Sequence, residues 1–429
     1  MITTHKTINA AMRGNTLLML YASSASTFTT AAFSAAFSAV ATNRPDTSNI
    51  RELLLSDVPL LDVRAPVEYE AGSIIPATIN IPILNNEERH EIGICYKEHG
   101  QEAAIVLGNQ LVTGTLKADR MKQWAEFARS NPDGYLYCFR GGLRSRTVQE
   151  WLELETGIRY PLIEGGYKKM RQFLMDELER SLDPERSDLI IIAGKTGVGK
   201  TRVIDHLGPQ RSIDLEGLAH HRGSSFGDTP EDIRQQSISQ IDFENSISMS
   251  LLKLLAAADS PTDDDMRQRE RTRVYVEDEG SRIGRFTLPH TLWTGMKQCN
   301  KLVIVDEDLE DRVTMILEDY IFDYGRRFVA LYGEELGPVL HREKMLGDLA
   351  RIRNKKLGSE NLARLTGIMG SAFDEQESSG DTALHRVWIS DLLSQYYDPM
   401  YEYQLSQRVD PEVLFRGKCN EVSQWAANN

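Results

Sequence analysis

A single cysteine, Cys138, stands at the head of the glycine- and arginine-rich loop CFRGGLRSR. The loop follows the apolar run GYLYC and precedes a helical pattern, so its backbone N–H groups can converge on the sulfur. Arg140, Arg144 and the N-terminus of the next helix would favour the thiolate, and Gly141 and Gly142 complete the loop. Such a thiolate is a nucleophile that can carry sulfur or selenium. The alternative is a buried structural cysteine.

The other cysteines, Cys95, Cys299 and Cys419, lie far apart in the chain, and no Cys-x-x-Cys pair occurs. Neither a zinc ribbon nor a disulfide framework is therefore predicted. Cys95, in GICYKEHG, is a second candidate nucleophile, but no comparable loop surrounds it. A reducing compartment is the simplest setting, and we expect the cytoplasm.

The second chemical signal is GKTGVGKT, residues 194–201, which fits the phosphate-binding pattern G-x-x-x-x-G-K-[ST]. It lies between the apolar run LIIIA and a helical pattern, which is the context that this motif requires. Gly194, Gly197 and Gly199 let backbone N–H groups turn around a phosphate, Lys200 adds positive charge and Thr201 can hold Mg²⁺. We predict a P-loop, but the motif leaves its phosphate compound open.

Acidic residues follow two later strand patterns, VEDEG at 277–279 and VDED at 306–308. Either could position Mg²⁺, and either could be a solvated loop. The segment DLEGLAHHRGSSFGD, residues 214–228, is predicted to be a substrate loop in which Asp214, Glu216 and Arg222 contact phosphate or RNA. Because the adjacent His220 and His221 would point apart on a helix or strand, no metal centre is predicted there.

The chain has 429 residues and a formal net charge of −14, which argues against a general nucleic-acid coat protein. Any RNA contact would be focal, at the basic runs SRIGR (281–285), YGRRF (324–328) and RIRNKK (351–356). No apolar run approaches the roughly 20 residues that a membrane helix needs, so no membrane contact is predicted. The oligomeric state stays open.

Three regions follow from the pattern of residues. Residues 1–45 form a low-complexity extension rich in Ala, Ser and Thr, either a transit peptide for an organelle or a tail from an early start codon. Strand patterns at VPLLDVR and GYLYC alternate with helical ones and predict a first α/β domain at 46–178. After a polar linker, strands at LIIIA, TRVYVED and KLVIVDED predict a P-loop NTPase-like α/β domain at 188–429 with a helical C-terminal part. An exposed loop is expected at 257–271.

The stretches LLDVRAPVEYEAGSIIPATINIPI, YCFRGGLRS and LIEGGYKKMR resemble the rhodanese domain, a sulfurtransferase fold whose active-site cysteine opens a cradle loop. This loop is longer than is usual in sulfurtransferases, and Ser73 stands where the family often has His. With NNEERHEIGICYK, GKTGVGKT, DLEGLAHHRGSSFG, FEN, VEDEGSRIG and YYDPMYEYQL, the chain from about residue 50 onward resembles the tRNA 2-selenouridine synthase family. That family joins a rhodanese-like domain to a P-loop domain in this order.

The resemblance implies a transferase that acts on 2-thiouridine at the wobble position of tRNA. It converts the base to an S-geranyl intermediate with geranyl diphosphate, then to 2-selenouridine with selenophosphate. Cys138 would carry or deliver selenium, and the P-loop would hold a diphosphate or a tRNA phosphate. The alternatives are an ATP-dependent sulfur-relay or redox-sensing P-loop protein, and an inert rhodanese-like binding module.

Overall fold

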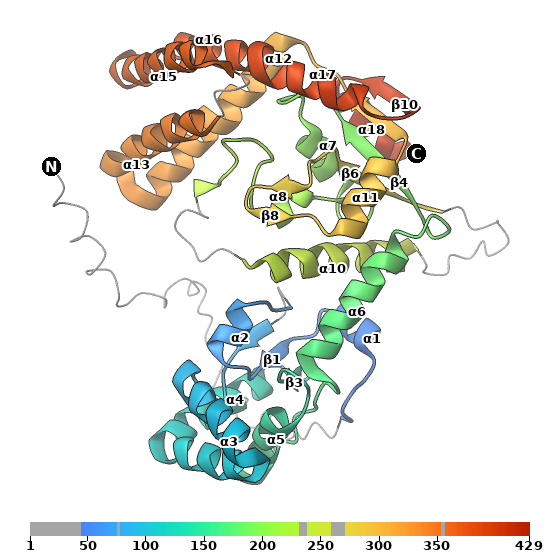
Figure 1. Cartoon of the computed structure of the whole chain (residues 1–429), viewed down its shortest axis with the longest axis vertical. Coiled ribbons are helices and arrows are strands. Elements are labelled where there is room, and N and C mark those ends of the chain that lie inside the picture. The colour runs from blue at the N-terminus through green and yellow to red at the C-terminus, as the bar shows by residue number, and fades with distance from the viewer. Residues whose placement is uncertain (1–43, 75–77, 231–237, 259–270, 353–356) are drawn as a thin grey trace, which may run out of the picture. The chain divides into compact units, whose positions relative to one another are not determined.

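The computed structural model describes residues 44–74, 78–230, 238–258, 271–352 and 357–429, all within one compact unit, Thr42–Asn429 (Figure 1). The predicted N-terminal extension falls almost entirely outside these residues, as does most of the loop predicted at 257–271. None of the described helices is both long and apolar enough to cross a membrane.

The first part of the unit is a short parallel sheet with helices around it. Its strands are β1 (Leu60–Asp62), β2 (Thr78–Asn80) and β3 (Tyr135–Tyr137), in the order β2-β1-β3. Its helices are α1 (Ile50–Leu55), α2 (Pro66–Glu70), α3 (Asn86–Leu111), α4 (Gly114–Ser130), α5 (Leu143–Thr156) and α6 (Gly166–Ser181). The strands predicted at VPLLDVR and GYLYC are β1 and β3.

A buried ion pair fixes the chain where β1 ends. The Asp62 and Arg64 side chains are 0% and 1% exposed, and Arg64 Nε donates to Asp62 Oδ2 over 2.8 Å. Arg64 Nη2 also donates to the carbonyl of Gly72 over 2.8 Å. Because each buried charge has its partner, the pair holds the DVR turn that leads into α2.

The second part is a five-stranded parallel sheet in the order β10-β9-β4-β6-β5. Its strands are β4 (Ser187–Ala193), β5 (Ser212–Ile213), β6 (Thr272–Glu277), β9 (Lys301–Val305) and β10 (Glu412–Gly417). The connecting helices are α7 (Lys200–Leu207), α8 (Leu215–Leu218), α10 (Gln240–Ala258) and α11 (His290–Gln298), with the hairpin β7 (Arg282–Ile283) and β8 (Phe286–Thr287). The sequence pattern missed β10, an edge strand whose apolar run is only three residues long (413–415) and in which no residue is fully buried.

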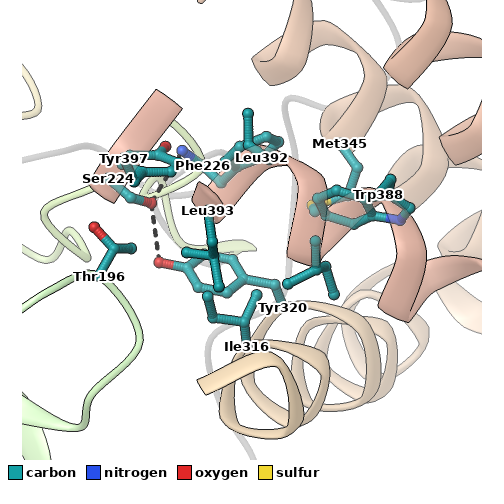
Figure 2. Close-up of a pocket in the computed structure, with 11 residues that line it drawn as sticks. Thr196, Ser224, Phe226, Ile316, Tyr320, Met345, Trp388, Leu392, Leu393 and Tyr397 are labelled. Carbon is teal, nitrogen blue, oxygen red and sulfur yellow. Dashed lines mark hydrogen bonds between the residues drawn. The ribbon is translucent and has the colours of Figure 1, made fainter. Parts of the chain in front are cut away.

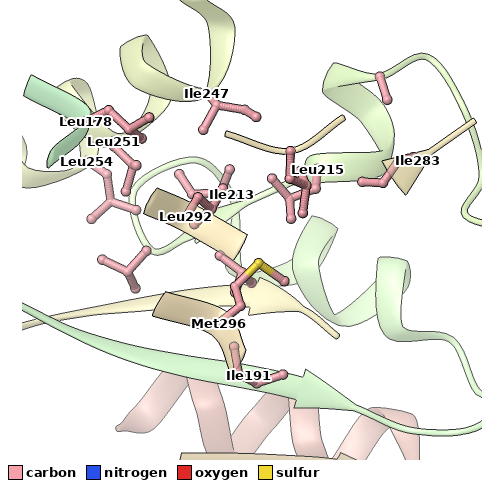
Figure 3. Close-up of a cluster of buried hydrophobic side chains, with 14 of the residues drawn as sticks. Leu178, Ile191, Ile213, Leu215, Ile247, Leu251, Leu254, Ile283, Leu292 and Met296 are labelled. Atoms are coloured by element: carbon pink, nitrogen blue, oxygen red, sulfur yellow. The ribbon is translucent and has the colours of Figure 1, made fainter. Parts of the chain in front are cut away.

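Both faces of the sheet are covered, which explains the continuous apolar run of β4. Ile191 packs with Leu251 of α10 and Leu292 of α11 on one face (Figure 3). Ile190 and Ile192 pack on the other face, against α7 and α18 (Cys419–Asn428). Side chains of α6 and α10 contribute to the cores of both sheets, so the domain boundaries 46–178 and 188–429 stay a prediction.

The predicted helical C-terminal part is confirmed. It comprises α12 (Leu309–Ile316), α13 (Tyr324–Arg351), α15 (Ser359–Ser379), α16 (Ala383–Leu392) and α17 (Asp398–Ser406). Two π-helical segments, η1 (Leu317–Asp323) and η2 (Leu393–Tyr397), interrupt it. Together these helices enclose a core of their own around Met345 and Trp388.

Two buried histidines predict acid sensitivity in this helical part. Burial lowers the pKa of both His341 and His385 from 6.5 to about 4. Between these values the unfolded chain binds more protons than the folded chain. The free energy of unfolding should therefore fall as the pH drops from about 6.5 to about 4, by up to ~1.4 kcal/mol per pH unit for each histidine. Urea unfolding across this range should show a smaller pH dependence in His341→Gln, and an unchanged dependence would contradict the assignment.

Candidate active site

Cys138 comes directly after β3 and just before α5, at the carboxyl end of a parallel strand. The residue is only 3% exposed, and its Sγ lies 3.3 Å from Oγ of Ser145 in the first turn of α5. Ser145 Oγ also donates to the carbonyl of Gly142 over 3.0 Å. The hydroxyl therefore ties the sulfur to the end of the loop.

The loop after Cys138 presents free backbone donors. Within the described part of the chain, the N–H groups of residues 139–144 have no protein acceptor. The N-terminus of α5 adds its partial positive charge at the same place. Unpaired donors at a helix N-terminus form a setting in which an anion or a thiolate is stabilised.

A glycine turn supports the back of this loop. Gly166 has a φ of +57°, and a Cβ added there would collide with the carbonyl oxygen of Cys138 and the backbone of Gly141. The N–H of Tyr167 donates to that same carbonyl over 2.9 Å. Only glycine allows this approach, which gives the EGGY segment of the sequence its local role.

The two arginines of the cysteine loop, Arg140 and Arg144, have different surroundings. Arg144 forms two hydrogen bonds with Glu68, of 2.5 Å and 3.1 Å, while Arg140 is exposed. Burial would raise the pKa of Glu68, but Arg144 outweighs it and the pKa is lowered. Glu68 therefore holds Arg144 in place, a positioning contact that the sequence pattern did not indicate.

The predicted P-loop connects β4 to α7. Gly194 has a φ of +153°, and a Cβ there would lie 2.5 Å from the carbonyl oxygen of Val305. Lys200 begins α7, and its Nζ donates to the carbonyl of Gly194 over 3.1 Å across the loop. Gly197 and Gly199 also have positive φ. The predicted phosphate-binding residues therefore share one loop at a helix N-terminus.

The acid nearest to the P-loop lies at the end of β6. Thr201 Oγ1 lies 2.9 Å from Oε1 of Glu277 and 3.2 Å from Oε2 of Glu216. Burial, followed by the charge of Glu216, raises the pKa of Glu277 well above its usual value. The competing acids after β9 are engaged elsewhere, since Glu307 accepts the N–H of Cys419 over 2.8 Å.

These oxygens fit a hard divalent cation. Glu277 is 0% exposed, and its Oε2 has no hydrogen-bond partner within the described residues. No group of three or more His, Cys, Asp or Glu in that part of the chain is arranged as a metal site. A Mg²⁺ ion would therefore rely on Thr201, Glu277 and oxygens of a bound phosphate compound.

The predicted substrate-loop residues are only partly brought together. Asp214 caps α8, with Oδ1 accepting the N–H of Gly217 over 2.7 Å. Glu216 and Arg222 line the cleft over the P-loop. Arg222 pairs with Asp319 over 3.1 Å and lies over the ring of Tyr320.

This P-loop cleft has a volume of about 510 Å³. Its walls also include Met400 and Tyr401 of α17. The sequence pattern missed the contacts that dock α17 on the loop. Arg312 donates to the carbonyl of Thr196 over 2.9 Å and to Asp398, the first residue of α17, over 2.6 Å.

The predicted basic runs are mostly paired within the protein. Arg326 lies 3.2 Å from Glu318, and Arg351 pairs with Asp348 and Asp228. Arg282 is exposed and lines the P-loop cleft. The rest of RIRNKK, residues 353–356, lies outside the described residues. The tRNA surface therefore stays a prediction.

Comparisons with known proteins cover nearly the whole described chain. A family model described as the tRNA 2-selenouridine synthase AAA domain matches residues 187–429. The tRNA 2-selenouridine synthase of Pseudomonas putida strain W619 is 46% identical over 382 residues, which are 89% of this chain and 98% of that protein. The Marinobacter nauticus protein of the same name is 45% identical over 386 residues, 90% of this chain and 98% of its own.

A solved structure, the N-terminal domain of a Clostridium difficile 630 protein described as ATP/GTP binding, matches with 38% identity and a TM-score of 0.26. That match covers 28% of this chain and 90% of the solved chain. The family model and the full-length relatives establish the relationship: the chain belongs to the tRNA 2-selenouridine synthase family.

Proposed function

We propose that this protein converts 2-thiouridine to 2-selenouridine at the wobble position of tRNA, through an S-geranyl intermediate. Geranyl diphosphate and selenophosphate are the co-substrates. The observation that supports this function best is that this chain has both a cysteine loop with unpaired N–H donors and a P-loop cleft. The cysteine loop suits selenophosphate, and the P-loop cleft suits geranyl diphosphate.

The P-loop is the proposed site of the prenyl step. The thiouridine sulfur attacks the first carbon of the geranyl chain, an S–C bond forms, the C–O bond breaks and diphosphate leaves. The base gives up its N3 proton. Lys200 and the loop N–H groups stabilise the charge on the leaving diphosphate, and a Mg²⁺ ion at Thr201 and Glu277 would add to that stabilisation when bound.

Cys138 is the proposed delivery point for selenium. If its thiolate attacks the phosphorus of selenophosphate, an S–P bond forms, the P–Se bond breaks and hydroselenide leaves. The N–H groups of residues 139–144 then face the phosphoryl oxygens. Water then hydrolyses the S–P bond, which releases inorganic phosphate and restores the thiol. Direct formation of an S–Se bond from selenophosphate would need a two-electron oxidant. Release of selenium as hydroselenide needs none. Cys138 is therefore proposed to deliver selenium and not to store it as a perselenide. Hydroselenide attacks C2 of the alkylated base and geranylthiol leaves.

Nucleoside mass spectrometry tests this function. We expect 2-thiouridine tRNA incubated with the protein, geranyl diphosphate and selenophosphate to yield 2-selenouridine. Without selenophosphate the S-geranyl nucleoside should accumulate. Turnover of ATP with neither product would favour the sulfur-relay alternative.

A further inference from the structure

A narrow apolar pocket lies beside the P-loop, among the C-terminal helices (Figure 2). Its walls are mostly hydrocarbon and aromatic side chains from four separate segments. They include Phe226, Ile316, Met345, Trp388, Leu392 and Leu393. The proposed function assigns no role to this pocket.

The pocket adjoins the P-loop cleft. Thr196 of the P-loop, Ser224, Ile316 and Tyr320 line both spaces. In Figure 2, Thr196 lies at one end of the pocket, and Met345 and Trp388 lie at the other. A ligand whose phosphates occupy the P-loop would therefore have its other end at the mouth of an apolar space.

Both π-helical segments face this pocket. Tyr320 comes from η1, and Leu393 and Tyr397 come from η2. The carbonyl of Tyr320 lies 2.8 Å from Nε2 of the buried His341. Single π turns inside α-helices occur frequently at functional sites, where they redirect side chains.

The chemistry of the walls favours a hydrocarbon over a nucleobase. Oγ of Ser224 and the hydroxyl of Tyr320 bond to each other over 3.0 Å. The indole N–H of Trp388 donates to Nδ1 of His385 over 3.0 Å. Ser224, Tyr320 and Trp388 therefore already have partners. The buried hydroxyl of Tyr397, which also lines the pocket, has none within the described residues. One hydroxyl cannot pair the several polar atoms at the edge of a base, which would be buried unpaired, while a hydrocarbon loses nothing.

We propose that this pocket receives the hydrocarbon end of an isoprenoid diphosphate held by the P-loop, and that Trp388 and Met345 limit the length of that chain. The inference rests on the prenyl step of the proposed function. The pocket volume is only about 30 Å³, so the chain enters as side chains turn aside. Met345 is unbranched and adapts readily, whereas Trp388 is rigid.

Binding measurements on the full chain test the proposal without relying on turnover. Inorganic pyrophosphate, geranyl diphosphate and the longer farnesyl diphosphate are titrated calorimetrically into wild type, Trp388→Leu and Met345→Ala. Wild type should bind geranyl diphosphate on the order of tenfold or more tighter than pyrophosphate, because methylene groups become buried. Both variants should shift the preference toward farnesyl diphosphate by about tenfold, with pyrophosphate affinity unchanged.

Val387→Ala is the matched control, since Val387 neighbours Trp388 on α16 but is 45% exposed. The ratio of its affinities for geranyl and farnesyl diphosphate should equal that of wild type. Trp388 and Met345 are 2% and 0% exposed, so a variant counts only where its pyrophosphate affinity is unchanged. Met345→Ala, which removes fewer atoms, decides the question if Trp388→Leu loses that affinity. Folded variants that bind geranyl diphosphate tightly and keep the wild-type ratio of affinities for geranyl and farnesyl diphosphate would contradict the proposed role of the pocket. That result would leave the proposed function intact. If wild type binds geranyl diphosphate no more tightly than pyrophosphate, both the proposed prenyl donor and the proposed role of the pocket are wrong.

Discussion

Replacement of Cys138 by alanine is expected to abolish 2-selenouridine formation, with a loss of at least about a thousandfold. The substitution removes the nucleophile proposed to release hydroselenide, while the N–H groups of residues 139–144 remain. It does not touch the P-loop, so S-geranyl nucleoside should still form and should accumulate. The measurement is nucleoside mass spectrometry with both co-substrates present.

The matched control is Cys95→Ala. Cys95 lies on α3 and is half-buried, and no Cys138-type loop surrounds it. This variant should produce 2-selenouridine at the wild-type rate. If Cys138→Ala folds, binds tRNA and loses both steps, the proposed separation of the two reactions is wrong. If it retains selenation, selenophosphate is the direct selenium donor to the base and the thiol is dispensable.

The parts of the candidate site whose place in the fold followed from the sequence are local in the chain. The P-loop motif is a contiguous strand, loop and helix, so Gly194, Lys200 and Thr201 could be placed from spacing alone. The position of Cys138 after a strand and before a helix followed in the same way. Each of these predictions needed only residues a few positions apart.

The parts that the sequence could not predict depend on strand order and distant pairing. β4 is flanked by both β6 and β9, so acids at the ends of either strand could have approached Thr201. Only the folded chain shows that Glu277 does so. Glu68 meets Arg144 across 76 residues, and Arg312 meets Asp398 across 86 residues. No periodicity signals contacts of this kind.

Replacement of Lys200 by alanine is expected to impair the prenyl step first. Losing a charge-assisted hydrogen bond to phosphate should weaken pyrophosphate binding by about 10- to 100-fold, measured by calorimetry. Lys195→Ala is the matched control, because Lys195 lies in the same loop but pairs with Glu402 over 2.9 Å. It should retain wild-type affinity.

Supplying the intermediate separates the steps in the Lys200→Ala protein. Given tRNA that already carries the S-geranyl nucleoside, this variant should form 2-selenouridine, because the Cys138 loop is intact. The Cys138→Ala protein should fail with the same tRNA. If pyrophosphate affinity is unchanged in Lys200→Ala, the assignment of the diphosphate to the P-loop is wrong. Failure on pre-geranylated tRNA would mean that the P-loop also serves selenium transfer, and the two sites would then have to act on the base together.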